Sequence, residues 1–81
     1  MTDSSSADDD RARLRRAAAA HTAAAQDVEA FLRRLPDVPG PADITEYANL
    51  LTREEQMRAD RETAADAAGI TIGSLESDQG T

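Results

Sequence analysis

A cluster of helix-breaking residues divides the chain into two long stretches that contain none. Pro36, Pro39, Gly40 and Pro41 lie within six residues of one another. Proline has no amide hydrogen to continue a helix, and it disfavours helical backbone at the residue before it. No other Pro or Gly occurs before Gly69. We therefore expect two helices, over 8–35 and 43–68, joined by a short connector over 36–42.

The start of the first stretch carries a helix signal of its own. Asp8, Asp9 and Asp10 would occupy the first turn, where negative charge opposes the positive end of the helix dipole. They also lie three or four residues before Arg11 and Arg13, a spacing that favours ion pairs on a helix. Residues 1–7 are polar and show no period, so we expect a disordered N-terminal segment there.

The second stretch has signals at both ends. Asp43 can cap the helix while Glu46 reaches back, as in a capping box. Gly69 suits the left-handed residue that ends a helix, with Ile70 folding back onto the last turn. A second capping pattern begins at Thr52 and leaves open a break near residue 51, which would give three helices. The tail over 70–81 is acidic and is predicted to be mostly irregular.

Two helices of similar length with a short connector pack against each other in opposite directions. The predicted fold class is thus all-α, a two-helix antiparallel hairpin. Its first helix carries an apolar stripe at the spacing of a coiled coil, with Phe31 beside it. The stripe consists of Leu14, Ala18, His21, Ala25, Val28, Leu32 and Leu35.

The larger apolar side chains gather around the connector, where we expect the core. They are Val28, Phe31, Leu32, Leu35, Val38, Ile44, Tyr47, Leu50 and Leu51. Only 12 of the 81 residues are Leu, Ile, Val or Phe, whereas 17 are Ala. A chain with so small a core and no cysteine for disulfides needs another source of burial. We expect a homodimer that completes a four-helix bundle, or a protein partner.

The net charge of −7 is unevenly distributed. Residues 11–35 carry +4 and residues 43–69 carry −4, so the two helices attract. The charged residues of the second helix, Glu54, Glu55, Arg58 and Arg61, are predicted to form a solvated face. The acidic start of the chain and the lack of a long apolar run predict a cytoplasmic protein without a membrane segment. All nine basic residues are Arg, a bias typical of bacterial genes rich in G and C.

The sequence lacks the residue sets that most catalytic sites need. It has one His, no Cys and no Gly-rich phosphate loop, and neither Glu54 nor Glu55 has a His three residues later. We therefore expect no enzyme activity, no metal, no cofactor and no small-molecule substrate. His21 lies on the apolar stripe, where it is predicted to sit at the edge with its ring partly in water; a pH switch of association is the alternative.

Residues 65–75 resemble the centre of a helix-turn-helix unit. Ala65, Gly69, Ile70, Thr71 and Leu75 match the small, glycine, aliphatic and hydroxyl positions of that family. The resemblance implies a DNA-binding regulator. Against nucleic acid stand the negative charge of the chain and the lack of aromatic residues among the arginines at 11, 13, 15 and 16.

The function predicted from the sequence is a small acidic, non-enzymatic protein–protein interaction module, such as an adaptor, assembly factor or regulator. Two alternatives remain, an atypical helix-turn-helix regulator using 65–75 and an accessory subunit or antitoxin-like inhibitor of a larger protein. The residues predicted to mediate self-association or partner binding are Leu14, His21, Val28, Phe31, Leu32, Leu35, Ile44, Tyr47, Leu51 and Met57.

Overall fold

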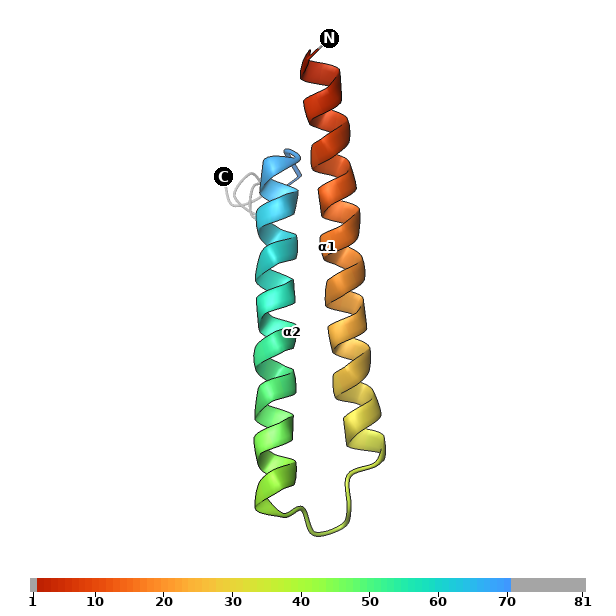
Figure 1. Cartoon of the computed structure of the whole chain (residues 1–81), viewed down its shortest axis with the longest axis vertical. Helices are drawn as coiled ribbons and strands as arrows, with labels where there is room; N and C mark the ends of the chain where they lie inside the picture. Colours follow the sequence, from red (N-terminus) through yellow and green to blue (C-terminus); the bar gives the residue numbers. More distant parts are fainter. Residues whose placement is uncertain (1, 71–81) are drawn as a thin grey trace, which may run out of the picture.

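The chain folds as an antiparallel hairpin of two helices, as predicted. A computed structural model describes residues 2–70, with side chains from Ser6 onward. Helix α1 spans Thr2–Arg33 and helix α2 spans Pro41–Ala67. Figure 1 shows all of α2 running alongside α1 in the opposite direction, while the first turns of α1 extend past the end of α2. We call the end with the connector the closed end and the opposite end the open end.

Helix α1 is longer at its start and shorter at its end than predicted. It begins at Thr2, six residues before Asp8, so residues 2–7 are helical where an irregular segment was expected. Five of these six residues are Thr, Asp or Ser, which favour a helix only weakly, but no Gly or Pro interrupts them and they continue the helix that follows. At the other end, the amides of Arg34 and Leu35 bond to the carbonyls three residues back, at 3.1 and 3.4 Å. This tighter turn ends α1 before Pro36.

Helix α2 begins two residues earlier than predicted. Gly40 is its N-cap and Pro41 its first residue, where the fixed φ of proline fits a helix and no amide hydrogen is needed. Asp43 is therefore not the cap: it lies in the first turn, and its carboxylate accepts a hydrogen bond from the Gly40 amide at 2.9 Å. Glu46, predicted to close the box, pairs instead with Arg34.

The rest of α2 is continuous and ends as the sequence predicts. No break occurs near residue 51, because the Thr52 hydroxyl donates to the Ala48 carbonyl at 2.9 Å and stays within the helix. Gly69 has φ of +80°. The Gly69 amide bonds to Asp66 and the Ile70 amide to Ala65, which is the Schellman arrangement.

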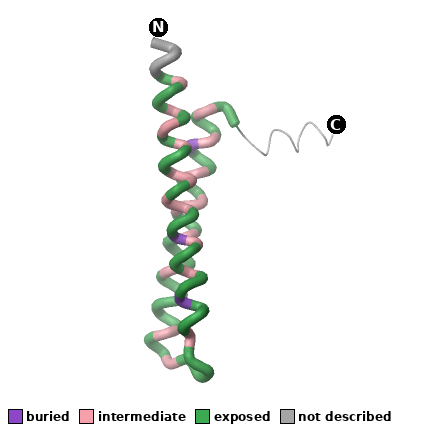
Figure 2. The backbone as a smooth tube through the Cα atoms, turned by 90° about the vertical axis from the view of Figure 1, so that its right-hand side faces the viewer, coloured by how far each residue is buried: buried purple, intermediate pink, exposed green. Residues whose placement is uncertain are grey.

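Three side chains are buried among those described, and two of them are alanines. Ala24 is 1% exposed, Phe31 3% and Ala64 3% (Figure 2). Each lies on the line where the two helices meet. The predicted core around the connector is thus much more open than expected: Val38 is 85% exposed, Ile44 62% and Leu32 46%. A single pair of helices has only one contact line, so most apolar side chains beside it stay in water.

Candidate interaction surface

The two helices meet along a coiled-coil seam. Four of the seven predicted stripe residues lie in it, and the other three positions are each taken by the preceding residue. On α1 the half-buried and buried residues follow alternating spacings of three and four through Ala17, Ala24 and Phe31. These residues replace Ala18, Ala25 and Leu32 of the prediction. The seam residues on the side of α1 are Leu14, Ala17, His21, Ala24, Val28 and Phe31, followed by Leu35 just past the helix. Their counterparts on the side of α2 are Tyr47, Leu50, Glu54, Met57, Arg61 and Ala64, followed by the C-cap Ala68.

The ring of Phe31 sets this register at the closed end. It stacks on Tyr47 with ring centroids 5.9 Å apart and an interplanar angle of 14°. The guanidinium of Arg34 lies over the Phe31 ring, 5.4 Å from its centroid, and donates to the Glu46 carboxylate at 2.9 Å. An aromatic pair gains from this geometry beyond the area it buries. Phe31 therefore takes the seam position, and Leu32 is turned toward solvent.

A polar pair joins the helices near the middle of the seam. The Nε2 atom of His21 lies 2.6 Å from the Glu54 carboxylate, and the two side chains are 15% and 24% exposed. The prediction that Glu54 belongs to a solvated charged face is thus wrong, because Glu54 is an interhelical partner. The same prediction is wrong for Arg61, which is half-buried at a seam position. Sequence reasoning missed the role of Glu54. The signal was present, because Glu54 follows Tyr47 and Leu50 at the coiled-coil spacing of three and then four residues.

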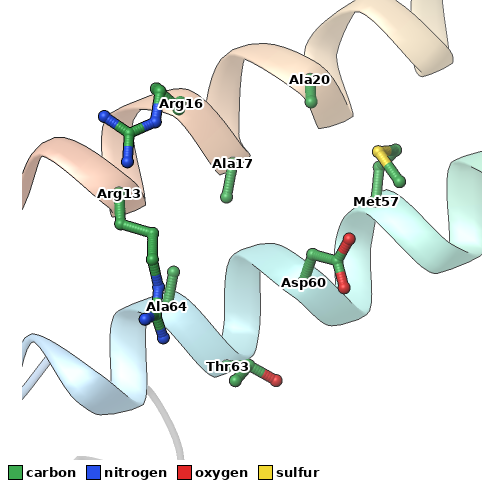
Figure 3. A pocket seen from close by; sticks show the side chains of 8 residues that line it. All are labelled: Arg13, Arg16, Ala17, Ala20, Met57, Asp60, Thr63 and Ala64. Carbon is green, nitrogen blue, oxygen red and sulfur yellow. The ribbon is translucent and has the colours of Figure 1, made fainter. Parts of the chain in front are cut away.

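One side of the seam is polar. Asp27 pairs with Arg53 at 3.5 Å on this side. Toward the open end the same side holds a shallow hollow of about 400 Å³. Figure 3 shows the Arg13 side chain extending from α1 toward α2. The hollow is lined by Arg13, Arg16, Ala17, Ala20, Met57, Asp60, Thr63 and Ala64. We call this side the polar flank.

The polar flank offers charge but no reactive pair. Thr63 supplies the hydroxyl in the hollow, and Asp60 supplies the carboxylate. The one histidine of the chain, His21, is hydrogen-bonded to Glu54 and does not line it. Within residues 2–70, no group of three or more His, Cys, Asp or Glu side chains is placed to hold a metal ion.

The other side of the seam is apolar. At the closed end, Leu32 and Ile44 line a hollow of about 200 Å³ together with Phe31 and Tyr47. One heptad further along, Leu51 is 37% exposed on the same side of α2. We define the apolar flank as the residues of this side, which are Ala18, Ala25 and Leu32 of α1 and Ile44, Leu51 and Ala65 of α2.

Arg58 falls between Leu51 and Ala65 on this flank, and its charge is neutralised within its own helix. It donates to Glu55 at 2.6 Å and to Glu62 at 2.7 Å. The hydrogen bond to Glu55 raises the pKa of the Arg58 guanidinium above its ordinary value, and the negative charges of Glu55 and Glu62 raise it further. The guanidinium is thus held along the helix surface by its neighbours.

The structure divides the residues predicted for binding into two groups. Seven lie at positions of the seam: Leu14, His21, Val28, Phe31, Leu35, Tyr47 and Met57. The remaining three, Leu32, Ile44 and Leu51, lie on the apolar flank. In the segment that resembles a helix-turn-helix unit, residues 65–67 end α2 and residues 68–70 form the capping turn, while Thr71 and Leu75 lie outside the described residues.

Comparisons with known proteins add no family to this description. No protein-family model, curated protein or solved structure matches the chain. Over the described residues, no helix is both long and apolar enough to cross a membrane.

Proposed function

We propose that this protein is a small acidic, non-enzymatic interaction module that binds another protein surface through its apolar flank. The observation that carries the proposal is the exposure of three large aliphatic side chains on one side of the hairpin. Leu32 is 46% exposed, Ile44 62% and Leu51 37%. Exposed apolar side chains that lie together and are rimmed by polar residues are typical of protein-binding sites.

The distribution of polar groups supports a binding role over a catalytic one. His21 and Glu54 are engaged with each other inside the seam, at 2.6 Å, and so serve the packing of the two helices. The hollow on the polar flank is open and lined mainly by small or charged side chains. Such a surface lacks the enclosure that shifts pKa values for acid–base chemistry. An adaptor, an accessory subunit and an antitoxin-like inhibitor all fit this proposal.

Site-specific photo-crosslinking in the native host tests the proposal. A photoreactive residue in place of Leu51 is expected to give discrete protein adducts, because this position faces whatever covers the apolar flank. The same residue in place of Ala19, an exposed position on the outer side of α1, is the control and should give none. The Leu51 adducts should also disappear when Leu32→Glu is added. Absence of adducts at Leu51, or equal adducts at both positions, would overturn the proposal.

A further inference from the structure

Building on the proposed function, we infer that the apolar flank is covered by a second copy of this chain. In the arrangement we propose, the two hairpins point the same way with their closed ends together. A two-fold axis runs along the hairpins, so that α1 of each copy packs against α2 of the other. The result is a four-helix bundle in which every neighbouring pair of helices is antiparallel.

The size of the flank fits a dimer interface. Helix α2 has 27 residues, which corresponds to about 40 Å at 1.5 Å per residue, and two adjacent helices are about 20 Å wide. One side of the hairpin therefore presents about 800 Å², which is the area that each partner contributes to a stable interface of standard size. Within the described residues the chain itself buries only three side chains, so this area is where a larger core can form.

The shapes of the side chains on the flank are self-complementary. The seam contacts of His21 with Glu54 and of Phe31 with Tyr47 place Ala25 level with Leu51 across the hairpin. The two-fold axis preserves these levels between copies. Leu51 of one copy then lies opposite Ala25 of the other, a large side chain over a small one.

The closed ends match in the same way. Leu32 of each copy lies opposite Ile44 of the other, which covers the two most exposed aliphatic side chains of the helices. The reverse arrangement, with closed end against open end, would place these side chains near Arg58 and the arginines at the start of α1. In the proposed arrangement Arg58 lies opposite Ala18 of the other copy and keeps its pairs with Glu55 and Glu62, and the exposed aliphatic side chains cover one another.

Charge selects the same arrangement. Residues 11–33 of α1 hold five Arg and two acidic residues, a net +3, and follow the aspartates at 8, 9 and 10. Helix α2 holds seven acidic residues and three Arg, a net −4. With the closed ends together, each positive α1 segment faces a negative α2, whereas the reverse arrangement sets α1 against α1 and α2 against α2. At the rim, Arg15 of one copy lies level with Glu62 of the other, an unlike pair.

The mass in solution tests self-association, and two alanines provide a matched pair of variants. We expect sedimentation equilibrium of the wild-type chain to give twice the 8.6 kDa chain mass. Ala25→Glu places a charge on the apolar flank and should raise the dimer dissociation constant at least about 100-fold, since a buried unpaired charge is costly. Ala20→Glu makes the same change on the polar flank of the same helix and should leave the constant within about threefold.

Disulfide formation tests the orientation independently of these variants, and the chain has no cysteine of its own to interfere. Chains with Ala25→Cys and chains with Leu51→Cys, mixed and oxidised, should form a mixed disulfide between the two variants. Neither variant alone should form a disulfide-linked dimer. Predominant linkage of two Ala25→Cys chains to each other, or of two Leu51→Cys chains to each other, would overturn the proposed arrangement.

The outcomes separate this inference from the proposed function. A wild-type mass of 8.6 kDa at about 1 mM overturns self-association. Equal weakening by Ala25→Glu and Ala20→Glu overturns the choice of flank. In either case the proposed function still stands if Leu51 crosslinks to a different protein in the host. The proposed function fails if Leu51 gives no adduct, and both proposals fail if the purified chain is then also a monomer.

Discussion

His21 and Glu54 are the residues where a polar contact replaces apolar packing inside the seam. The histidine ring and the carboxylate lie 2.6 Å apart and retain 15% and 24% of their side-chain exposure. A half-buried carboxylate that loses its partner retains the cost of its desolvation. The pair therefore fixes which turn of α1 lies beside which turn of α2, because sliding by one turn separates the two groups.

Removing the histidine should be more costly than removing a partner from an exposed ion pair. We expect His21→Ala to lower the free energy of unfolding by about 1–2 kcal/mol, measured by urea denaturation at fixed protein concentration. The control is Arg33→Ala, which breaks an exposed pair with Glu29 whose side chains are 74% and 71% exposed. That change should cost at most about 0.5 kcal/mol. Equal losses for the two variants would contradict the assigned role of His21.

The sequence alone does not predict which of Phe31 and Leu32 takes the seam position. Helix α1 is apolar at three positions of each heptad, so a stripe through either residue satisfies the spacing rule. The choice depends on Tyr47, which stacks on the Phe31 ring from the other helix. Contacts between elements distant in sequence are not visible in the periodicity of one of them. For the same reason the engagement of Glu54 by His21 was not predicted.

At the scale of the elements, the helix ends follow local chemistry closely. The stop at Gly69 was predicted because left-handed backbone strongly favours glycine, and its φ is +80°. The start of α2 was misplaced because two capping arrangements compete over residues 40–46. Gly40 followed by Pro41 provides the cap and the first residue, which leaves Asp43 to bond back from the first turn. A single sequence does not rank such alternatives.

The hydrogen bond between the Asp43 carboxylate and the Gly40 amide can be tested by a substitution in the first turn of α2. Asp43→Ala removes the acceptor for the Gly40 amide and a negative charge from the first turn, and should cost about 1 kcal/mol of unfolding free energy. Hydrogen exchange should show faster exchange at the Gly40 amide in particular. Asp37→Ala, a change at an exposed connector residue, is the control. An unchanged exchange rate at Gly40 in the Asp43 variant would refute the contact.

At the scale of the whole molecule, stability depends on very few buried groups. Phe31 is the one large side chain among the three that are buried in the described part of the chain. A chain of this length has a stability of about 4–12 kcal/mol by the usual value per residue. The packing that holds the two helices together is thus concentrated near the closed end of the hairpin.

Removing the Phe31 ring should take away a large part of the free energy of unfolding. We predict that Phe31→Ala removes about 3–5 kcal/mol, seen as a large fall in the thermal midpoint by circular dichroism. Phe31→Leu keeps most of the apolar volume and should lose less than half as much. A melting curve for Phe31→Ala that overlays the wild type would show that the stack with Tyr47 does not hold the hairpin together.

The unequal ends of the hairpin also set an order of events during folding. Phe31 and Tyr47 are joined by the short connector, whereas His21 and Glu54 are 33 residues apart. Closing the shorter loop costs less entropy, so we expect the aromatic stack to form first and the helices to pair turn by turn toward the alanine-lined open end. On the same ground we expect the open end to form last and to separate first. In the dimer that we propose, two copies would then meet at their closed ends before either hairpin is fully paired.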